Sequence, residues 1–335
     1  MSDPAPAPYA SLTPDCVLDA LESVGLEGDG RLLALNSYEN RVYRAHLVDG
    51  TVVVVKFYRP GRWSDDAILE EHAFAHELAD AEVPVVAPLD LMAPGGAHAT
   101  LAHHAGFRFA VYPRRSGRAP ELDHEGTLAW IGRFIGRMHA TGARRPFVHR
   151  PSLDVATMGD TSREYLLGSG LLPPDLEPAY RAAVDLAIAG AHRCFARAGA
   201  VRTLRLHGDC HVGNILWTAE GPHFVDLDDA RSGPAVQDLW MLLSGSRSEM
   251  SDQIRAVVQG YRQFYDFDVG ELQLIEALRT LRLVHYAAWI AQRWSDPAFP
   301  AAFPWFNTQR YWQDRILELR EQIASMDEPP LELER

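Results

Sequence analysis

A run of twenty residues with four spaced polar side chains constrains the fold more than any other feature of this sequence. It begins with His207-Gly208-Asp209, reaches Asn214 after four intervening residues, and ends at Asp226, twelve residues after Asn214. Two short apolar runs, 215–217 and 223–227, predict a β-hairpin between Asn214 and Asp226. A short loop would then hold Asp209 and Asn214 on one wall, and the hairpin would bring Asp226 back beside Asn214.

These residue types, in this order, match the requirements of phosphoryl transfer from ATP. The reaction needs a carboxylate that orients the acceptor hydroxyl and accepts its proton. It also needs oxygen ligands for Mg²⁺, a hard ion that suits Asp and Asn. A kinase catalytic loop reads His-x-Asp, four residues, Asn, and then an Asp after a further strand. The spacing therefore predicts Asp209 as the catalytic base and Asn214 and Asp226 as Mg²⁺ ligands, with ATP as the phosphate donor.

The basic residues single out one position. Among 32 lysine and arginine residues, Lys56 is the only lysine. A coding bias toward arginine explains the others but not Lys56, since a compact ammonium is not interchangeable with a guanidinium. Lys56 lies in a buried β run, 52–57, which follows an Asp49-Gly50 turn. We expect it to supply the cation that phosphoryl transfer requires at the α- and β-phosphates.

Hydrophobic periodicity predicts a β-rich first third and a mainly helical remainder. After a short helix at 11–27, the runs 32–35, 41–47 and 52–57 predict three antiparallel strands, with a polar loop at 36–40. Ser64-Asp65-Asp66 predicts the start of a helix that continues to about residue 79. Further strands are expected at 85–86, 107–112, 202–206, 215–217 and 223–227. Further helices are expected at 125–141, 176–198, 238–245, 250–265, 270–294 and 308–325.

Composition excludes several classes of protein. A net charge of −13 argues against a nucleic-acid-binding surface, which requires clustered positive charge. No apolar run approaches the roughly 18 residues of a membrane helix. Three widely spaced cysteines, with no metal-like pair, favour a reduced protein of the cytoplasm. No coiled-coil pattern is present, so we expect a monomer.

Longer strings of the sequence resemble a known family. The segment His207-Gly208-Asp209-x-His211-x-x-Asn214, followed by an apolar strand ending in Asp, resembles the signature of the aminoglycoside-phosphotransferase-like branch of the protein-kinase superfamily. Within that branch the chain is similar to the bacterial stress response kinase A family. The strings that carry this similarity are 35–43, 55–63, 68–72, 225–231 and 233–243.

The resemblance implies an α+β fold of the bilobal protein-kinase-like type. The N-lobe, 1–112, would be an antiparallel sheet with one helix, and the C-lobe, 113–335, would be mainly helical. The resemblance further implies a cytosolic enzyme that transfers the γ-phosphate of ATP to Ser or Thr of proteins and serves stress survival. Only seven residues separate Asp226 from Pro234, so a long activation loop is not expected.

The resemblance also implies an ATP site built around Lys56. Lys56 would pair with a glutamate of the 64–79 helix, and we favour Glu71 over Glu70. Phe74, Ala75 and Leu78 then follow Glu71 at helical spacing and pack the helix. A polar loop replaces the usual glycine-rich loop over the phosphates. The remaining residues expected to bind ATP are Ser37 and Tyr38 in that loop and Tyr112 and Arg114 at the hinge.

Other residues near the catalytic loop have less specific predictions. His207 is expected to be structural. Asp238 either caps a helix or braces the catalytic loop with a buried carboxylate. Asp228 either binds a second metal ion or adds charge beside the first. His211 contacts substrate or metal, or is structural. Cys210, next to Asp209, is a candidate redox switch, although the neighbouring carboxylate should raise the pKa of its thiol.

Three alternatives remain open from the sequence. The acceptor could be a small molecule, such as an aminoglycoside, an amino alcohol or a sugar, rather than a protein. The chain could be a pseudokinase, although Lys56, Asp209, Asn214 and Asp226 are all present. His207, Asp209 and His211 could instead bind zinc or iron in a metallohydrolase.

Overall fold

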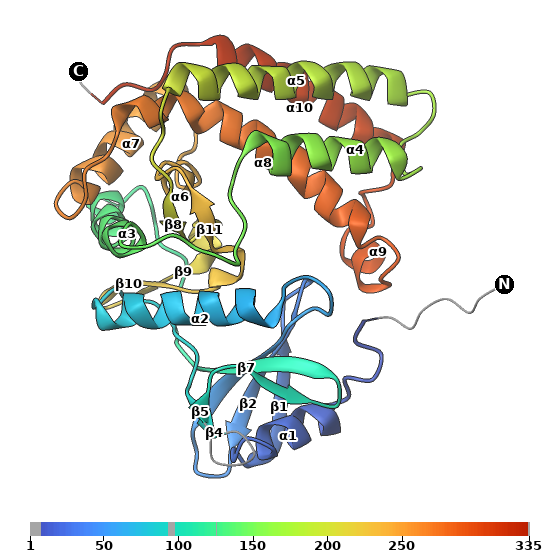
Figure 1. Cartoon of the computed structure of the whole chain (residues 1–335), viewed down its shortest axis with the longest axis vertical. Helices are drawn as coiled ribbons and strands as arrows, with labels where there is room; N and C mark the ends of the chain where they lie inside the picture. Colours follow the sequence, from blue (N-terminus) through green and yellow to red (C-terminus); the bar gives the residue numbers. More distant parts are fainter. Residues whose placement is uncertain (1–7, 93–97, 125, 334–335) are drawn as a thin grey trace. The chain divides into compact units, whose positions relative to one another are not determined.

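The chain divides into two compact units, each built from segments that are not contiguous in sequence. The computed structural model describes residues 8–92, 98–124 and 126–333. The first unit comprises 1–119, 148–150 and 215–228, and the second comprises 120–147, 151–214 and 229–335 (Figure 1). The predicted lobe boundary at residue 112 stays a prediction. The first unit also takes in the segment around Arg150 and the hairpin before Asp226, both of which lie beyond that boundary in sequence.

An antiparallel sheet of five strands forms the centre of the first unit. Its strands are β1 (Gly28–Leu35), β2 (Arg41–Leu47), β3 (Val52–Phe57), β6 (Ala102–His104) and β7 (Phe107–Pro113). They are arranged in the order β1-β2-β3-β7-β6, so β3 lies between β2 and β7. The predicted opening of three antiparallel strands is confirmed, and so is the strand at 107–112.

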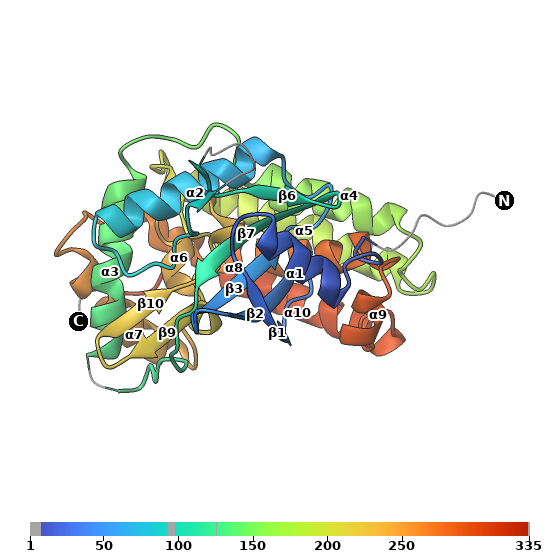
Figure 2. The same cartoon turned by 90° about the horizontal axis from the view of Figure 1, so that it is seen from below.

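The two faces of this sheet are covered by different helices. Val53 and Val55 point to a core that includes Val17 and Leu21 of α1 (Pro14–Glu22). Because side chains alternate along a strand, Lys56 points to the opposite face. On that face Ile68 of α2 (Asp65–Asp80) packs with Tyr58 and Ala110. Figures 1 and 2 show α1 and α2 on the two sides of the sheet.

Two short hairpins complete the first unit. One pairs β4 (Leu91–Met92) with β5 (His98–Ala99), and the other pairs β9 (Ile215–Thr218) with β10 (Gly221–Phe224). The expected strand at 85–86 is only an isolated bridge between Val85 and Phe224. The expected strand at 223–227 ends early at Phe224. Asp226 adopts a φ of 61°, which no extended strand accommodates, and the chain then enters a 3₁₀ turn at Leu227–Asp229.

Helices make up most of the second unit. They are α3 (Thr127–Gly142), α4 (Thr161–Gly168), α5 (Glu177–Ala198), α6 (Gln237–Trp240), α7 (Arg247–Tyr261), α8 (Ile275–Gln292), α9 (Ala298–Ala302) and α10 (Gln309–Asp327). Two short strands, β8 (Leu204–Leu206) and β11 (Arg231–Gly233), pair antiparallel. A π-helical turn spans Ala156–Asp160, and 3₁₀ turns span Val212–Asn214 and Val269–Leu274.

The predicted helices differ from these in identifiable ways. The helix expected from 250 begins at Arg247, because Ser246 and Glu249 form a capping box that the apolar pattern does not reveal. The helix expected at 238–245 ends at Trp240. The sequence did not predict α4, α9 or β11. The first residue of the predicted 125–141 helix lies outside the described residues.

Close helix packing organises the core of the second unit. Helix α3 packs along α7, and α8 packs with α4, α5 and α10 (Figure 1). At Gly132 of α3, a Cβ atom would lie 2.1 Å from the carbonyl oxygen of Val257 in α7. The absence of a side chain at Gly132 is therefore what lets the two helices approach. No helix within the described ranges combines the length and the apolarity that crossing a bilayer requires.

Candidate active site

Lys56 is held by two carboxylates of the first unit. Its Nζ lies 3.2 Å from Oδ1 of Asp226 and 3.0 Å from Oδ1 of Asp228. The ammonium also lies 5.1 Å from the centre of the Tyr58 ring. Burial alone would lower the pKa of Lys56, but the negative charges of Asp228, Asp226 and Glu71 outweigh it and hold the pKa well above its usual value. Lys56 therefore stays charged.

Asp228 is the centre of a buried polar network. Oδ2 of Asp228 accepts hydrogen bonds from Nδ2 of Asn40, at 3.2 Å, and from the guanidinium of Arg62. Oδ1 of Asn40 in turn accepts from the backbone N–H of Arg59, at 3.1 Å. Together with Lys56, these partners engage both carboxylate oxygens. Asn40 and Arg62 are 188 and 166 residues away in sequence, so no local pattern could have assigned them to this network.

Glu71 lies near Lys56 but does not pair with it directly, which corrects the expectation from the sequence. Glu71 is 2% exposed, and its burial raises its pKa to about 7 despite the charge of Lys56. Among the described residues, the ion pairs of Lys56 go instead to Asp226 and Asp228. Glu71 acts on Lys56 through its charge.

Glu70 has a separate function in the fold. Its carboxylate accepts three backbone N–H groups, from Val148 at 2.6 Å, His149 at 2.8 Å and Arg150 at 2.9 Å. The guanidinium of Arg150 stacks over the Trp63 ring at 4.1 Å and donates to the backbone carbonyl of Asp228. Helix α2 is thereby connected through the 148–150 segment to the turn that contains Asp228. The sequence did not predict this role for Glu70 or Arg150.

The other residues expected to bind ATP also belong to the first unit. Ser37 and Tyr38 are in the loop between β1 and β2, and Tyr38 is exposed. The Tyr112 hydroxyl hydrogen-bonds to the Tyr58 hydroxyl at 2.9 Å. Arg114, just after β7, is exposed. The Tyr112 hydroxyl is thus engaged in a hydrogen bond inside the first unit. Any contact of Tyr112 with adenine is therefore expected from its backbone.

A buried carboxylate braces the catalytic loop in the second unit. Oδ2 of Asp238 accepts the backbone N–H of His207 and Oδ1 accepts that of Gly208, both at 2.8 Å. Asp238 also contacts Nε2 of His139 at 3.0 Å. Of the two roles considered for Asp238, bracing is the one that this geometry supports. Asp238 lies within α6, and the residue preceding that helix, Val236, makes no side-chain cap.

The loop requires glycine at position 208. Gly208 has a φ of 84°, and a Cβ atom there would lie 2.2 Å from the backbone oxygen of Asp229. Both the backbone conformation and the close approach exclude a side chain. Ordinary protein kinases usually carry arginine here, and this packing gives a physical reason why the present chain does not.

Asp209 belongs to this braced loop, and each of its carboxylate oxygens has a nitrogen of another side chain beside it. Oδ1 lies 2.5 Å from a guanidinium nitrogen of Arg282 on α8, and Oδ2 lies 3.4 Å from Nε2 of His211. Burial would raise the pKa of Asp209, but the hydrogen bond from His211 and the charge of Arg282 outweigh it, so the pKa is lowered. Asp209 is ionised, as a base must be. Arg282 was not predicted, since it lies 73 residues from Asp209.

Asn214 is attached to the same loop and leads into the hairpin. Its amide nitrogen donates to the backbone carbonyl of Asp209 at 3.0 Å. Ile215, the next residue, pairs with Phe224, which precedes Asp226 by two residues. The predicted hairpin between Asn214 and Asp226 is therefore present. The Asp226 side chain is 55% exposed, and its backbone has a positive φ that is uncommon outside glycine and concentrates at functional sites.

The zinc or iron alternative has no support in the geometry. The described residues contain no group of three or more His, Cys, Asp or Glu side chains arranged to hold a metal ion. His207 is fully buried, and its Nδ1 accepts from the backbone N–H of Asp209 at 3.4 Å. Cys210 is also fully buried, and burial raises its thiol pKa well above the usual value. Such a thiol is not a ready redox switch.

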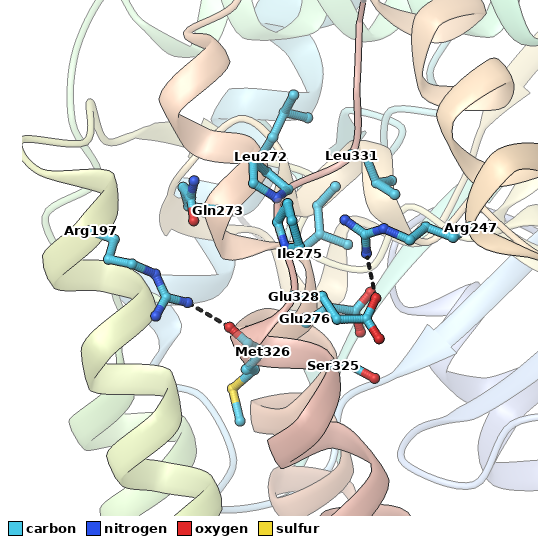
Figure 3. A pocket seen from close by; sticks show the side chains of 12 residues that line it. Arg197, Arg247, Leu272, Gln273, Ile275, Glu276, Ser325, Met326, Glu328 and Leu331 are labelled. Atoms are coloured by element: carbon cyan, nitrogen blue, oxygen red, sulfur yellow. Dashed lines mark hydrogen bonds and ion pairs between the residues drawn. The ribbon is translucent and has the colours of Figure 1, made fainter.

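A separate pocket lies where the C-terminal segment folds against the second unit. Figure 3 shows Arg197 reaching the backbone oxygen of Met326, and Arg247 reaching Glu328, from opposite sides of this hollow. Leu272, Ile275 and Leu331 form its apolar wall. None of the predicted catalytic residues lines it. The pocket therefore belongs to the packing of the C-terminal segment.

The model of the phosphotransferase enzyme family matches residues 31–275 of the sequence. Stress response kinase A of Escherichia coli (strain K12) is 46% identical over 325 residues, which are 97% of this chain and 97% of that protein. A protein named serine/threonine protein kinase RdoA, of Salmonella typhimurium (strain LT2), is 45% identical with the same coverage of both chains.

Solved structures with the same fold are more distant in sequence. Amicoumacin kinase hAmiN, in complex with AMP-PNP, Ca²⁺ and Ami, superimposes with a TM-score of 0.72 at 19% identity, over 95% of this chain and 94% of that one. A microcompartment-associated aminopropanol kinase gives a TM-score of 0.70 at 19% identity, over 96% and 100% of the two chains. At this identity the similarity shows the fold.

Proposed function

Since the chain belongs to the stress response kinase A family, within the phosphotransferase enzymes, and is a kinase, we propose that it transfers the γ-phosphate of ATP to a serine or threonine hydroxyl of a protein. The observation that carries the proposal is the catalytic loop. Its backbone is fixed by Asp238 and Asn214, and it presents an ionised Asp209. The protein acceptor is supported by the name of the Salmonella relative.

Lys56 is the proposed ligand of the α- and β-phosphates. Its charge is stabilised by Asp226, Asp228 and Glu71, so it is available to an anion without deprotonating. In the proposal, the loop that contains Ser37 and Tyr38 covers the phosphates. The backbone of Tyr112 and Arg114 meets the adenine.

Asn214 and Asp226 each offer an oxygen donor of the kind that Mg²⁺ prefers, and we propose them as its ligands. Asn214 uses its amide nitrogen in the hydrogen bond to Asp209, so its amide oxygen, a suitable Mg²⁺ ligand, is not the atom in that bond. The Asp226 carboxylate is half exposed and contacts only a cation, Lys56, in the interactions described above. When bound, Mg²⁺ would neutralise charge on the phosphate oxygens. Asp228 is engaged by Asn40, Arg62 and Lys56, so we assign it a supporting role.

The proposed reaction conserves every atom. The acceptor hydroxyl oxygen attacks the γ-phosphorus, and the bond from that phosphorus to the β,γ-bridging oxygen breaks. ADP leaves with the electrons of that bond, and the hydroxyl proton passes to Asp209. Lys56 stabilises negative charge on the nucleotide, and Asp238 keeps the loop of Asp209 in place through His207 and Gly208.

We propose that the protein acts in the cytoplasm as a monomer. Cys16, Cys194 and Cys210 are all free thiols, as expected where proteins stay reduced. Size-exclusion chromatography with light scattering would test the monomer. A mass that corresponds to two or more chains would contradict it.

The proposed function is tested by comparing the purified protein with its Asp209→Asn variant. Radiolabelled ATP, Mg²⁺ and a mixture of proteins would be supplied, and label in phosphoserine and phosphothreonine measured. Loss of the positioned base is expected to slow transfer by about 10²–10⁴-fold. Asp185→Asn, an exposed α5 residue paired with Arg163, is the matched control. Label that appears equally with Asp209→Asn would contradict the proposal. In a parallel reaction that contains an amino alcohol, label in that compound and in no protein would replace the protein acceptor with a small molecule.

A further inference from the structure

Arg44, in the middle of β2, differs from the other arginines of the five-stranded sheet in having no polar partner within the described ranges. Its Nε is buried and donates to no acceptor. The other arginines of the sheet all have partners: Arg31 with Asp29, Arg41 with the backbone of Tyr38, and Arg108 with Asp65. No polar contact inside the protein therefore occupies the Arg44 guanidinium, which is available to a ligand.

The strand register places Arg44 on the same face of the sheet as Lys56. Arg44 pairs with Val54 of β3, and Lys56 follows Val54 by two residues. Residues that pair across two strands share a face, and so do residues two apart along one strand. The opposite face contains Ala45 and Leu47, which belong to the core beneath α1. Arg44 thus lies on the face that holds the proposed phosphate ligand.

Two rows of side chains cross this face from β1 to β7. One row is Leu35, Val42, Lys56 and Ala110, and the other is Leu33, Arg44, Val54 and Tyr112. The first row adjoins the loop proposed to cover the phosphates. The second row, about 7 Å further along the strands, contains the residue whose backbone is proposed to meet the adenine. Arg44 is therefore on the base side of Lys56.

The side chains around Arg44 suit a flat ring better than a phosphate. Its two neighbours in the row, Leu33 and Val54, are apolar, and Leu33 is 48% exposed. No carboxylate belongs to the row, and the hydroxyl of Tyr112 already bonds to Tyr58. A guanidinium is planar and stacks on aromatic faces, and every nucleobase has such a face.

We propose that the guanidinium of Arg44 stacks on the base of the bound nucleotide, which makes Arg44 a specificity-determining residue that favours nucleotides over polyphosphates without a base. This inference rests on the proposed function and adds a residue to its nucleotide site. A guanidinium stacked on a ring strengthens binding by about 10-fold. Because Arg44 lies away from the phosphates, the contact acts on nucleotide affinity and not on the transfer step.

Equilibrium binding without an acceptor tests the inference. The ligands are AMP-PNP and inorganic tripolyphosphate, each with Mg²⁺, and calorimetry gives their dissociation constants. Arg44→Gln removes the guanidinium, and Arg44→Tyr keeps a planar side chain without the charge. Arg31→Gln is the matched control, because it makes the same change at an exposed arginine of the neighbouring strand.

Arg44→Gln is expected to weaken AMP-PNP about 10-fold and to leave tripolyphosphate within about 2-fold of the wild type, as Arg31→Gln should for both ligands. Arg44→Tyr should recover most of the AMP-PNP affinity, since a ring also stacks on a base. An unchanged AMP-PNP affinity in Arg44→Gln would mean that Arg44 is only solvated, which would overturn the inference. An equal loss for both ligands, in a variant with the wild-type unfolding midpoint, would mean that Arg44 contacts phosphate and would overturn it as well.

Phosphate transfer separates this inference from the proposed function. With the protein acceptor, Arg44→Gln should raise KM for ATP about 10-fold and leave kcat unchanged. Transfer by the wild type, with the same KM in Arg44→Gln, would overturn the inference alone. Binding of AMP-PNP that depends on Arg44, without transfer to protein, would support the inference and overturn the proposed acceptor. A wild-type protein that binds no AMP-PNP would overturn both.

Discussion

At the scale of single residues, burial and neighbouring charges determine the pKa values of the titratable side chains. Glu271, 1% exposed, accepts the backbone N–H of Val236 at 2.8 Å, just before α6. Helix α6 contains Asp238, which braces the catalytic loop. Burial raises the pKa of Glu271 to about 7, although its backbone hydrogen bonds oppose the shift. Protonation of Glu271 is thus linked, through the backbone of Val236 and helix α6, to the residue that braces the catalytic loop.

The pH dependence of stability should therefore change in Glu271→Gln. Because the folded-state pKa is raised from 4.5 to about 7, the folded protein binds more protons than the unfolded chain in this window. The free energy of unfolding therefore falls as pH rises through it. Between about pH 5 and pH 8 the free energy of unfolding should fall by roughly 2–3 kcal/mol less in the variant than in the wild type. Urea unfolding at both pH values measures it, with exposed Glu321→Gln as control. An unchanged slope in Glu271→Gln would contradict the assignment.

At the scale of elements, the spacing between α3 and α7 depends on residues without side chains. Gly132 allows the contact, because its position faces the backbone of Val257 and not a movable side chain. Helix α3 also supplies His139, which hydrogen-bonds both Tyr261 of α7 and Asp238. The distance between these two helices thus affects the support of the catalytic loop.

Gly132→Ala should destabilise the protein. The added Cβ would lie 2.1 Å from a backbone oxygen, so one helix must move. Overpacking of this kind typically costs about 1–3 kcal/mol. Gly168→Ala, in α4, is the matched control, because a Cβ there meets nothing within 4 Å. That change should be neutral or slightly stabilising, since alanine favours helix. Equal unfolding midpoints for the two variants in urea would refute the close-packing argument.

At the scale of the whole molecule, each compact unit is built from segments that are separated in sequence. The first unit includes 148–150 and the hairpin segment 215–228, and the second unit continues to the C-terminal segment. That segment is anchored by Arg247, 3.2 Å from Glu328, and by Arg255, 3.0 Å from the backbone oxygen of Leu333. Leu331 lies between these anchors and is 4% exposed.

The last residues should therefore contribute to stability. Leu331→Ala removes a buried side chain from the wall of the pocket in Figure 3. Such a truncation typically costs about 2–5 kcal/mol, and we expect the lower half of this range for a site at the end of the chain. The neighbouring Glu332 is exposed, so Glu332→Ala should change the unfolding free energy by less than about 0.5 kcal/mol. If calorimetry gave both variants the wild-type midpoint, the segment would not be part of the cooperative unit.

The sequence by itself determined the elements that depend on local patterns. Alternation at 41–47 and apolar runs at 32–35, 52–57 and 107–112 predicted β2, the second half of β1, β3 and β7, and the Ser64 cap predicted the start of α2. The spacing of Asp209, Asn214 and Asp226 predicted the loop and the hairpin, because a hairpin is closed by residues that are close in sequence. The resemblance to the family was likewise recognised from short contiguous segments of the sequence.

Only the tertiary structure decided which residues surround these groups. Arg282 meets Asp209 across 73 residues, Arg62 meets Asp228 across 166, and Asp238 meets His207 across 31. Lys56 forms ion pairs with Asp226 and Asp228, 170 and 172 residues further along the chain, while Glu71 acts on it through its charge. Such choices depend on desolvation and on the distance between charges, and neither exists until the chain has folded.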